Sequence, residues 1–224
     1  MGGDYYSQKL SANRLKRVYD IAPPRVRQYL NAEIAHVIGS INPQHEVLEL
    51  GCGYGRVLAD LAAKASWAAG IDTSLDSLQF ARTYCRAQAN VALAAMDAAR
   101  LGFHDHTFDI VVCIQNGISA FHVDQHVLIE EALRVVRPGG LVQFSTYAAR
   151  FWNDRLTWFE LQADEGLLGE IDYQHTGDGV ITCQDGFTAT TVSPAEFRKL
   201  TEGVRAEVRL IEIDESSLFC ELRP

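Results

Sequence analysis

The sequence predicts an α/β fold in which helices cover both faces of a parallel, doubly wound sheet. Short apolar runs alternate with helical patterns at the spacing of βαβ units. One run, 108–114, is almost continuously apolar, as expected of a strand that is buried on both faces. A chain of 224 residues suits one such domain with a modest insertion, the excursion 147–192.

The first 40 residues are expected to form an N-terminal helical cap. Residues 1–20 are polar and rich in tyrosine. Apolar residues recur at helical spacing from Arg25 to about Ser40, and the two prolines before them suit the first turn of a helix.

A glycine-rich turn follows the first predicted strand, 47–50. Gly51, Gly53 and Gly55 alternate there, and they let the backbone turn sharply and bring its N–H groups close to a ligand. The helix predicted over 55–64 points its positive end at the same place. Taken alone, the turn indicates only a nucleotide-like ligand.

The remaining elements are predicted from their patterns and caps. The strands are expected at 67–72, 91–95, 108–114 and 141–145, and the helices at 75–88, where Ser74 is the cap, and at 126–136, which Pro138 and two glycines end. The tail is expected to hold a helix at 152–164, a β-hairpin of 171–176 with 180–183, a helix opening at Ser193 with a capping box to Glu196, and an antiparallel pair, 206–213 and 217–222, at one edge of the sheet.

Polar residues end the successive strands, and the carboxyl ends of parallel strands share one edge of the sheet, where ligands bind. Asp72 follows the glycines by about 20 residues, the spacing at which a carboxylate accepts from ribose hydroxyls. Asp97 can accept from the exocyclic amine of an adenine while the N–H of Ala98 faces a ring nitrogen. Gln115 offers amide groups to the polar tail of a ligand.

With these features the sequence resembles the class I S-adenosylmethionine-dependent methyltransferases over about residues 45–146. The motifs that carry the resemblance are 49–55 (ELGCGYG), 70–74 (GIDTS), 96–98 (MDA), 108–111 (FDIV) and 133–140 (LRVVRPGG). The resemblance implies a Rossmann-like, seven-stranded sheet whose last two strands form the reversed edge pair. It also implies that S-adenosyl-L-methionine is the cofactor and S-adenosyl-L-homocysteine its product.

The resemblance further implies which residues contact the cofactor. Glu49 and the glycine turn would hold its methionyl end, Asp72 its ribose, Asp97 its adenine, and Gln115 would line the sulfonium side. The full predicted set is Tyr19, Glu49, Gly51, Cys52, Gly53, Gly55, Asp72, Thr73, Asp97, Ala98 and Gln115. Tyr5, Tyr6 and Tyr19, together with 147–192, would cover the site and bind the acceptor.

The acceptor is expected to be a small molecule methylated at oxygen or nitrogen. Residues 114–118 (IQNGI) depart from the Asn/Asp-Pro-Pro-Tyr pattern of relatives that methylate adenine or glutamine nitrogen, which disfavours those acceptors. His122 is the candidate general base, since its ordinary pKa lies near neutrality, and the alternative is that it belongs to a polar helix start.

The sequence is also compatible with two other functional classes. A nicotinamide-dependent dehydrogenase shares the strand–turn–acid layout, but its glycines run G-x-G-x-x-G rather than G-x-G-x-G. A noncatalytic protein that only binds S-adenosylmethionine is the second.

The composition bears on the binding partners and the cellular compartment that we expect for the protein. The net charge of −9 disfavours nonspecific nucleic-acid binding, which needs a basic surface. Five scattered cysteines indicate reduced thiols, and no His, Cys or Asp set has metal-ligand spacing. The sequence shows no long apolar run, so we expect a soluble, cytoplasmic protein without a membrane partner. The oligomeric state stays open, with a homodimer as one option.

Overall fold

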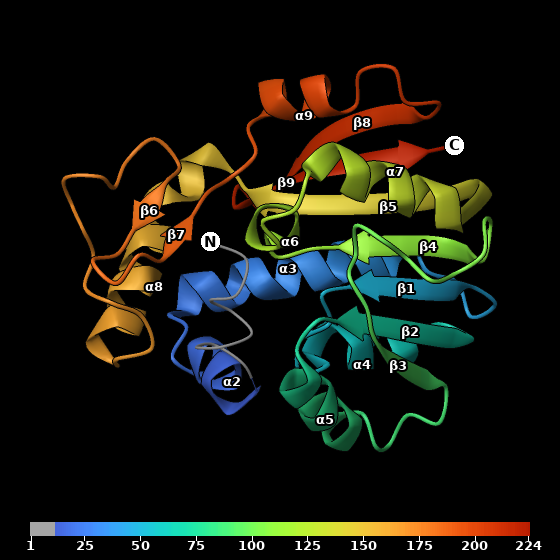
Figure 1. Ribbon diagram of the computed structural model, residues 1–224, viewed down its shortest axis with the longest axis horizontal. Helices are drawn as coiled ribbons and strands as arrows, with labels where there is room; N and C mark the ends of the chain where they lie inside the picture. Colours follow the sequence, from blue (N-terminus) through green and yellow to red (C-terminus); the bar gives the residue numbers. More distant parts are fainter. Residues whose placement is uncertain (1–11) are drawn as a thin grey trace.

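The computed structural model describes residues 12–224, and they are arranged around a seven-stranded sheet (Figure 1). The sheet strands are β1 (Glu46–Leu50), β2 (Trp67–Asp72), β3 (Val91–Ala95), β4 (Phe108–Cys113), β5 (Val136–Tyr147), β8 (Glu207–Ile213) and β9 (Ser217–Arg223). Their order across the sheet is β3-β2-β1-β4-β5-β9-β8. The first five run parallel, and β9 pairs antiparallel with both β5 and β8.

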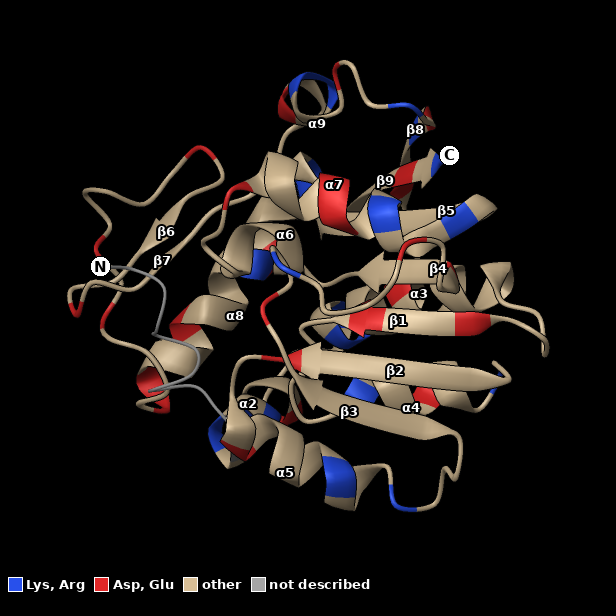
Figure 2. Ribbon diagram, turned by 45° about the vertical axis from the view of Figure 1, so that its right-hand side comes forward, with Lys and Arg blue, Asp and Glu red and all other residues tan. Residues whose placement is uncertain are grey.

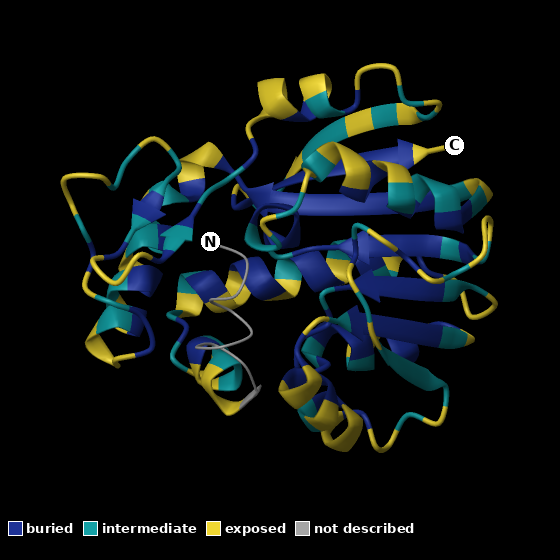
Figure 3. Ribbon diagram, viewed as in Figure 1, coloured by how far each residue is buried: buried dark blue, intermediate teal, exposed yellow. Residues whose placement is uncertain are grey.

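The described chain also contains α-helices and one 3-10 turn, and several of them cover the two faces of the sheet. They are α2 (Ala12–Asp20), α3 (Pro24–Ser40), α4 (Arg56–Ala62), α5 (Leu75–Tyr84), α6 (Gly117–Ala120), α7 (Gln125–Val135), the 3-10 turn η1 (Ala149–Phe151), α8 (Trp152–Asp164) and α9 (Pro194–Leu200). Apolar side chains of α3 and α4 pack with Val47 and Val112 on one face, whereas those of α7 and α9 pack with Leu48 and Val111 on the other. Neighbouring strand residues therefore face opposite layers. The strands β1, β2, β4, β5 and β9 are largely buried, whereas the edge strands β3 and β8 are more exposed (Figure 3).

A second, smaller layer lies beyond the end of β5. It contains α8 and the short antiparallel strands β6 (Ile181–Thr182) and β7 (Thr188–Ala189). Its apolar side chains pack in one cluster with those of α2 and α3, including Val18 and Tyr29. The N-terminal helices and the excursion 147–192 thus form one cap beside the sheet (Figure 1).

The predicted fold class is confirmed, including the reversed pair at the edge and two of the caps. The Ser74 side chain accepts from the Ser77 N–H, and Ser193 and Glu196 form the capping box. Helix α5 ends at Tyr84, earlier than expected.

The expected start of the fifth strand at 141 was wrong. Strand β5 begins at Val136, directly after α7, and Val136 pairs with Phe108 before a register shift. A residue that precedes a proline favours extended backbone, so Arg137, which precedes Pro138, is extended and belongs to β5. The sequence pattern predicts only that Pro138 ends the helix.

The predicted pairing of the hairpin was also wrong in part. Ile171 and Cys183 form only an isolated bridge, while the two-stranded ladder joins β6 to β7. Side chains satisfy the backbone locally instead: the Asp172 carboxylate accepts from the Gln174 N–H and contacts the His175 ring. Such local bonds compete with a strand ladder.

Among residues 12–224, every helix is too short or too polar to cross a membrane.

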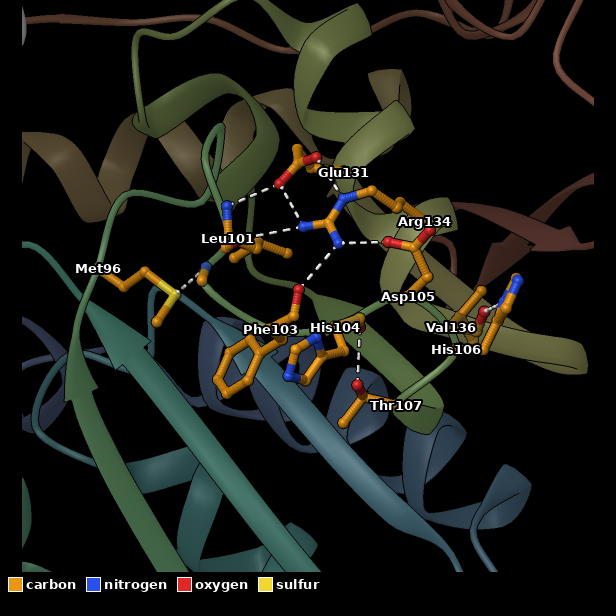
Figure 4. A network of polar contacts seen from close by, with 11 residues as sticks. Met96, Leu101, Phe103, His104, Asp105, His106, Thr107, Glu131, Arg134 and Val136 are labelled. Carbon is orange, nitrogen blue, oxygen red and sulfur yellow. Dashed lines mark hydrogen bonds and ion pairs between the residues drawn. The ribbon is translucent and has the colours of Figure 1, made fainter.

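A polar network holds the loop that joins β3 to β4 (Figure 4). The Arg134 guanidinium on α7 donates to the carbonyl oxygens of Leu101 and Phe103, each at 2.9 Å. It also pairs with Asp105 at 2.8 Å and with Glu131 at 2.7 Å. The loop therefore depends on one planar cation that bonds in several directions at once.

Replacing Arg134 with lysine should remove most of these bonds while it keeps the charge. A lysine ammonium lacks the planar fork, so backbone carbonyls of the loop lose their partner. We expect the free energy of unfolding to fall by about 1–3 kcal/mol, measured by urea denaturation. The exposed Arg82 on α5 provides the control, and an equal loss in R82K would contradict this role for Arg134.

Candidate functional site

The turn after β1 has a shape that glycine alone allows. Gly51 has φ +73°, and a Cβ on it would lie 2.4 Å from the Phe121 ring. Gly55 has φ +88°, and a Cβ there would lie 2.8 Å from the Cys85 Sγ. Both positions combine a left-handed backbone with close neighbours, so the turn is tightly specified by its sequence.

The Asp72 carboxylate joins this turn to the end of β2. Its Oδ2 accepts from the Gly53 N–H at 2.9 Å, and its Oδ1 accepts from the Ser74 N–H at 2.8 Å. Burial raises the pKa of Asp72, and these backbone donors oppose the rise. The carboxylate is therefore fixed in direction at the edge where β1 and β2 end, where Figure 2 shows acidic residues at both strand ends.

Glu49 is a buried acid without a partner for one oxygen. It is 5% exposed, and within the described residues its Oε2 accepts no hydrogen bond. Burial raises the pKa of Glu49 to about 8, although Arg56 lowers it. Burying a carboxylate without a partner costs free energy, and a cationic ligand bound beside Glu49 would remove part of this cost.

Arg56 and Gln115 form the centre of the site. The Arg56 guanidinium donates to the Gln115 Oε1, and its carbon lies 4.4 Å from the centroid of the Tyr19 ring. The Gln115 Nε2 and the Arg56 Nε are buried and lack acceptors among residues 12–224. Both groups can therefore donate to a ligand.

The backbone behind Gln115 is held by a second buried acid, Glu33 of α3. The Gln115 N–H is shared between the Glu33 Oε2 and the Ser145 Oγ, each at 2.8 Å. Gln115 and Asn116 both have left-handed backbone, with φ of 58° and 65°. Glu33 is fully buried, and this burial raises its pKa to about 7. It thus helps to fix the strained loop after β4.

A cavity of about 390 Å³ lies at the carboxyl ends of β1 to β4. It brings together most residues of the predicted site, namely Tyr19, Glu49, Gly51, Cys52, Gly53, Asp72, Thr73, Asp97, Ala98, Gln115 and His122. Their individual roles remain predictions.

One predicted residue, Gly55, lies away from the cavity, and two others fall outside the described residues. Gly55 does not line this cavity; it packs against Cys85 and Ala81, between α4 and α5. Tyr5 and Tyr6 lie outside the described residues. His122 lines the cavity but is exposed, and no hydrogen bond within residues 12–224 orients its ring.

The sequence reasoning missed several residues of the site. Glu33 gave a signal, because it lies on the apolar face of a helix between Leu30 and Val37, where an acid is unexpected. Phe159 and Gln162 of α8 also line the cavity, and no motif marked them. No cluster of three possible metal ligands occurs in the part of the chain that the structure describes.

Glu33 predicts a pH dependence of stability. The unfolded chain releases this proton near the ordinary pKa of 4.5, whereas the folded protein keeps it up to about pH 7. The folded state binds more protons between these values, so this carboxyl costs stability as the pH rises through that window. The shift corresponds to about 3 kcal/mol.

Replacement of Glu33 with glutamine tests this account, because glutamine keeps an acceptor for the Gln115 N–H. We expect the free energy of unfolding of E33Q to fall less between pH 5 and pH 8 than that of the unmodified protein, measured by urea denaturation at each pH. Parallel pH profiles of the two proteins would contradict it.

The fold matches that of a solved methyltransferase structure. The N-methyltransferase NodS from Bradyrhizobium japonicum WM9, in complex with S-adenosyl-L-homocysteine, has a TM-score of 0.64 at 17% identity, and the match covers 99% of this chain and 97% of that one. The architecture is the class I methyltransferase fold.

Sequence comparison places the resemblance in the same residues as the motifs. Residues 47–140 match the family described as "Methyltransferase domain". An arsenite methyltransferase from Aquipseudomonas alcaligenes is 29% identical over 72% of this chain and 49% of its own length. A demethylmenaquinone methyltransferase from Mycobacterium sp. is 38% identical over 47% of this chain and 44% of its own length. The resemblance to class I methyltransferases is thus confirmed, although the chain spans about half the length of these relatives.

Proposed function

We propose that the protein is an S-adenosylmethionine-dependent methyltransferase that transfers a methyl group to oxygen or nitrogen of a small molecule. The observation that supports this most is the cavity at the carboxyl ends of β1, β2 and β3. It gathers the unpartnered carboxylate of Glu49, the oriented carboxylate of Asp72 and the Asp97–Ala98 pair in motif order.

The residues present fit this cofactor. The unpartnered Glu49 Oε2 matches the methionyl ammonium, and Gly51, whose left-handed backbone lies close to the Phe121 ring, lines the same cavity. Asp72 would accept from the ribose hydroxyls, and Asp97 with Ala98 would face the adenine. When bound, the cofactor supplies a methyl group on a positively charged sulfur.

The chain itself would contribute mainly alignment. Tyr19, Arg56 and Gln115 line the cavity, and the contacts of Arg56 with the other two keep them in place. Holding the two reactants in line supplies much of the rate of such a displacement. His122 is the candidate base for acceptors that must lose a proton.

A small-molecule acceptor is supported by the cap. Helix α8 and α2 line the cavity together through Trp158 and Tyr19, which encloses the site. The two relatives described above are named for arsenite and demethylmenaquinone, both small molecules. The single-domain division, with 45–146 as cofactor core and 147–192 as acceptor lid, belongs to this proposal. So does a cytoplasmic location, which five unpaired, buried cysteines support.

Isothermal titration calorimetry tests the cofactor directly. S-adenosyl-L-homocysteine should bind with a stoichiometry near one, and NAD should give no heat. Binding of NAD alone would overturn the proposal in favour of an oxidoreductase. A cofactor-binding protein that methylates no member of a broad panel of phenols, amines and thiols would instead be noncatalytic.

Glu49 predicts that cofactor binding is linked to proton release. At pH 7 the free protein holds this carboxyl mostly protonated, because its pKa is about 8. Pairing with an ammonium requires the ionised form, so binding of S-adenosyl-L-homocysteine should release about one proton and tighten up to about tenfold per pH unit below pH 8. Calorimetry in two buffers of different ionisation enthalpy measures the proton count.

Replacement of Glu49 with glutamine provides the matched variant. E49Q should bind more weakly, release no proton and lose the pH dependence below pH 8. Unchanged proton release in E49Q would show that another group is responsible.

A further inference from the structure

One wall of the cavity, opposite the glycine turn, comes from the end of β5 and from α8. We call its four residues, Tyr147, Trp158, Phe159 and Gln162, the lid wall. The Trp158 ring lies 6.1 Å from that of Tyr19 and 6.1 Å from that of Phe159. The Trp158 indole N–H donates to the Val18 carbonyl at 3.0 Å, which fixes the ring and uses its only donor. The lid wall is therefore largely flat and aromatic.

Gln162 adds one polar group to this wall. It follows Trp158 by four residues on the same helix face and is 3% exposed. Its Nε2 is buried and lacks an acceptor within residues 12–224. A buried donor without a partner carries a desolvation cost that an oxygen atom of a ligand in the cavity would remove.

The lid wall carries no charge of its own, and a cation lies behind it. Its four residues include no acid and no cation. Behind them the buried Arg155 lies with its guanidinium carbon 4.6 Å from the Tyr147 ring centroid and 5.4 Å from that of Phe159. The guanidinium donates to the carbonyls of Gly179 and Ala189. A buried positive charge beside the wall disfavours an ammonium ion there and stabilises an anion.

We propose that the methyl acceptor is a planar aromatic molecule with a ring hydroxyl, bound against the lid wall as its phenolate, with an oxygen accepting from the Gln162 side chain. This inference rests on the proposed function and narrows it to oxygen methylation. Aromatic faces of Tyr147, Trp158 and Phe159 recognise the flat ring. An amine acceptor would find no carboxylate on this wall to hold its ammonium form.

The chemical step balances without a further reactant. The phenol releases its proton to water on ionisation. The phenolate oxygen then forms a bond to the methyl carbon while the carbon–sulfur bond breaks, and that electron pair goes to sulfur. The products are an aryl methyl ether and S-adenosyl-L-homocysteine.

The test measures binding to the protein saturated with S-adenosyl-L-homocysteine, by calorimetry at pH 8. The probes are 4-nitrophenol, which is an anion at this pH, cyclohexanol, which is not planar, and benzylamine, which is a cation. We expect 4-nitrophenol to bind with a stoichiometry near one and the other two to bind at least tenfold more weakly.

Two variants locate the contact. Gln162→Leu should weaken 4-nitrophenol about tenfold, as expected for one lost hydrogen bond to a charged ligand, and leave the binding of S-adenosyl-L-homocysteine unchanged. Gln174→Leu, in the same cap but exposed and outside the cavity, should match the unmodified protein.

Each outcome bears on one claim. Failure of S-adenosyl-L-homocysteine to bind would overturn the proposed function itself. If it binds but cyclohexanol or benzylamine matches 4-nitrophenol, the aromatic anion is the wrong acceptor class. Equal affinity of Q162L and Q174L for 4-nitrophenol would remove Gln162 from the site.

Discussion

The carboxylate of Asp72 is the interaction on which the shape of the site most depends. It accepts from the backbone of the glycine turn through Gly53 and from the helix start through Ser74, so the ends of β1 and β2 are held together. The left-handed glycines make this possible, because the turn must bring a backbone N–H to within 2.9 Å of the side chain. The Asp72 carboxylate therefore holds the glycine turn against the end of β2, and the same hydrogen bonds fix the orientation of the carboxylate.

The second organising feature is the junction of Tyr19, Arg56 and Gln115, where the Arg56 side chain contacts the other two in the lining of the cavity. Acids gather on the side of the glycine turn, with Glu49 left unpartnered, whereas the lid wall is aromatic and uncharged. Glu33 supports the junction from behind through the backbone of Gln115. The unpartnered Glu49 thus favours a cation beside the glycine turn, whereas Arg155 behind the lid wall disfavours a cation there.

The parts that follow local rules could be predicted from the sequence. The strand–helix alternation, the Ser193 capping box and the motif acids depend on short-range patterns, and the structure places most of them as expected. The partner of the cap hairpin could not be predicted, because side chains such as Asp172 competed with the strand ladder. Gln162 was missed because its interest lies in a buried side-chain N–H that finds no acceptor within the described residues of the folded structure. The spacing of residues along the sequence does not reveal this.

A crystal structure of the complex with S-adenosyl-L-homocysteine tests the central claim most directly. We expect a ligand whose ammonium contacts Glu49, whose ribose contacts Asp72 and whose sulfur faces the lid wall across Gln115. A ligand bound with its ribose away from Asp72, or outside the cavity formed by the ends of β1 to β4, would contradict the account.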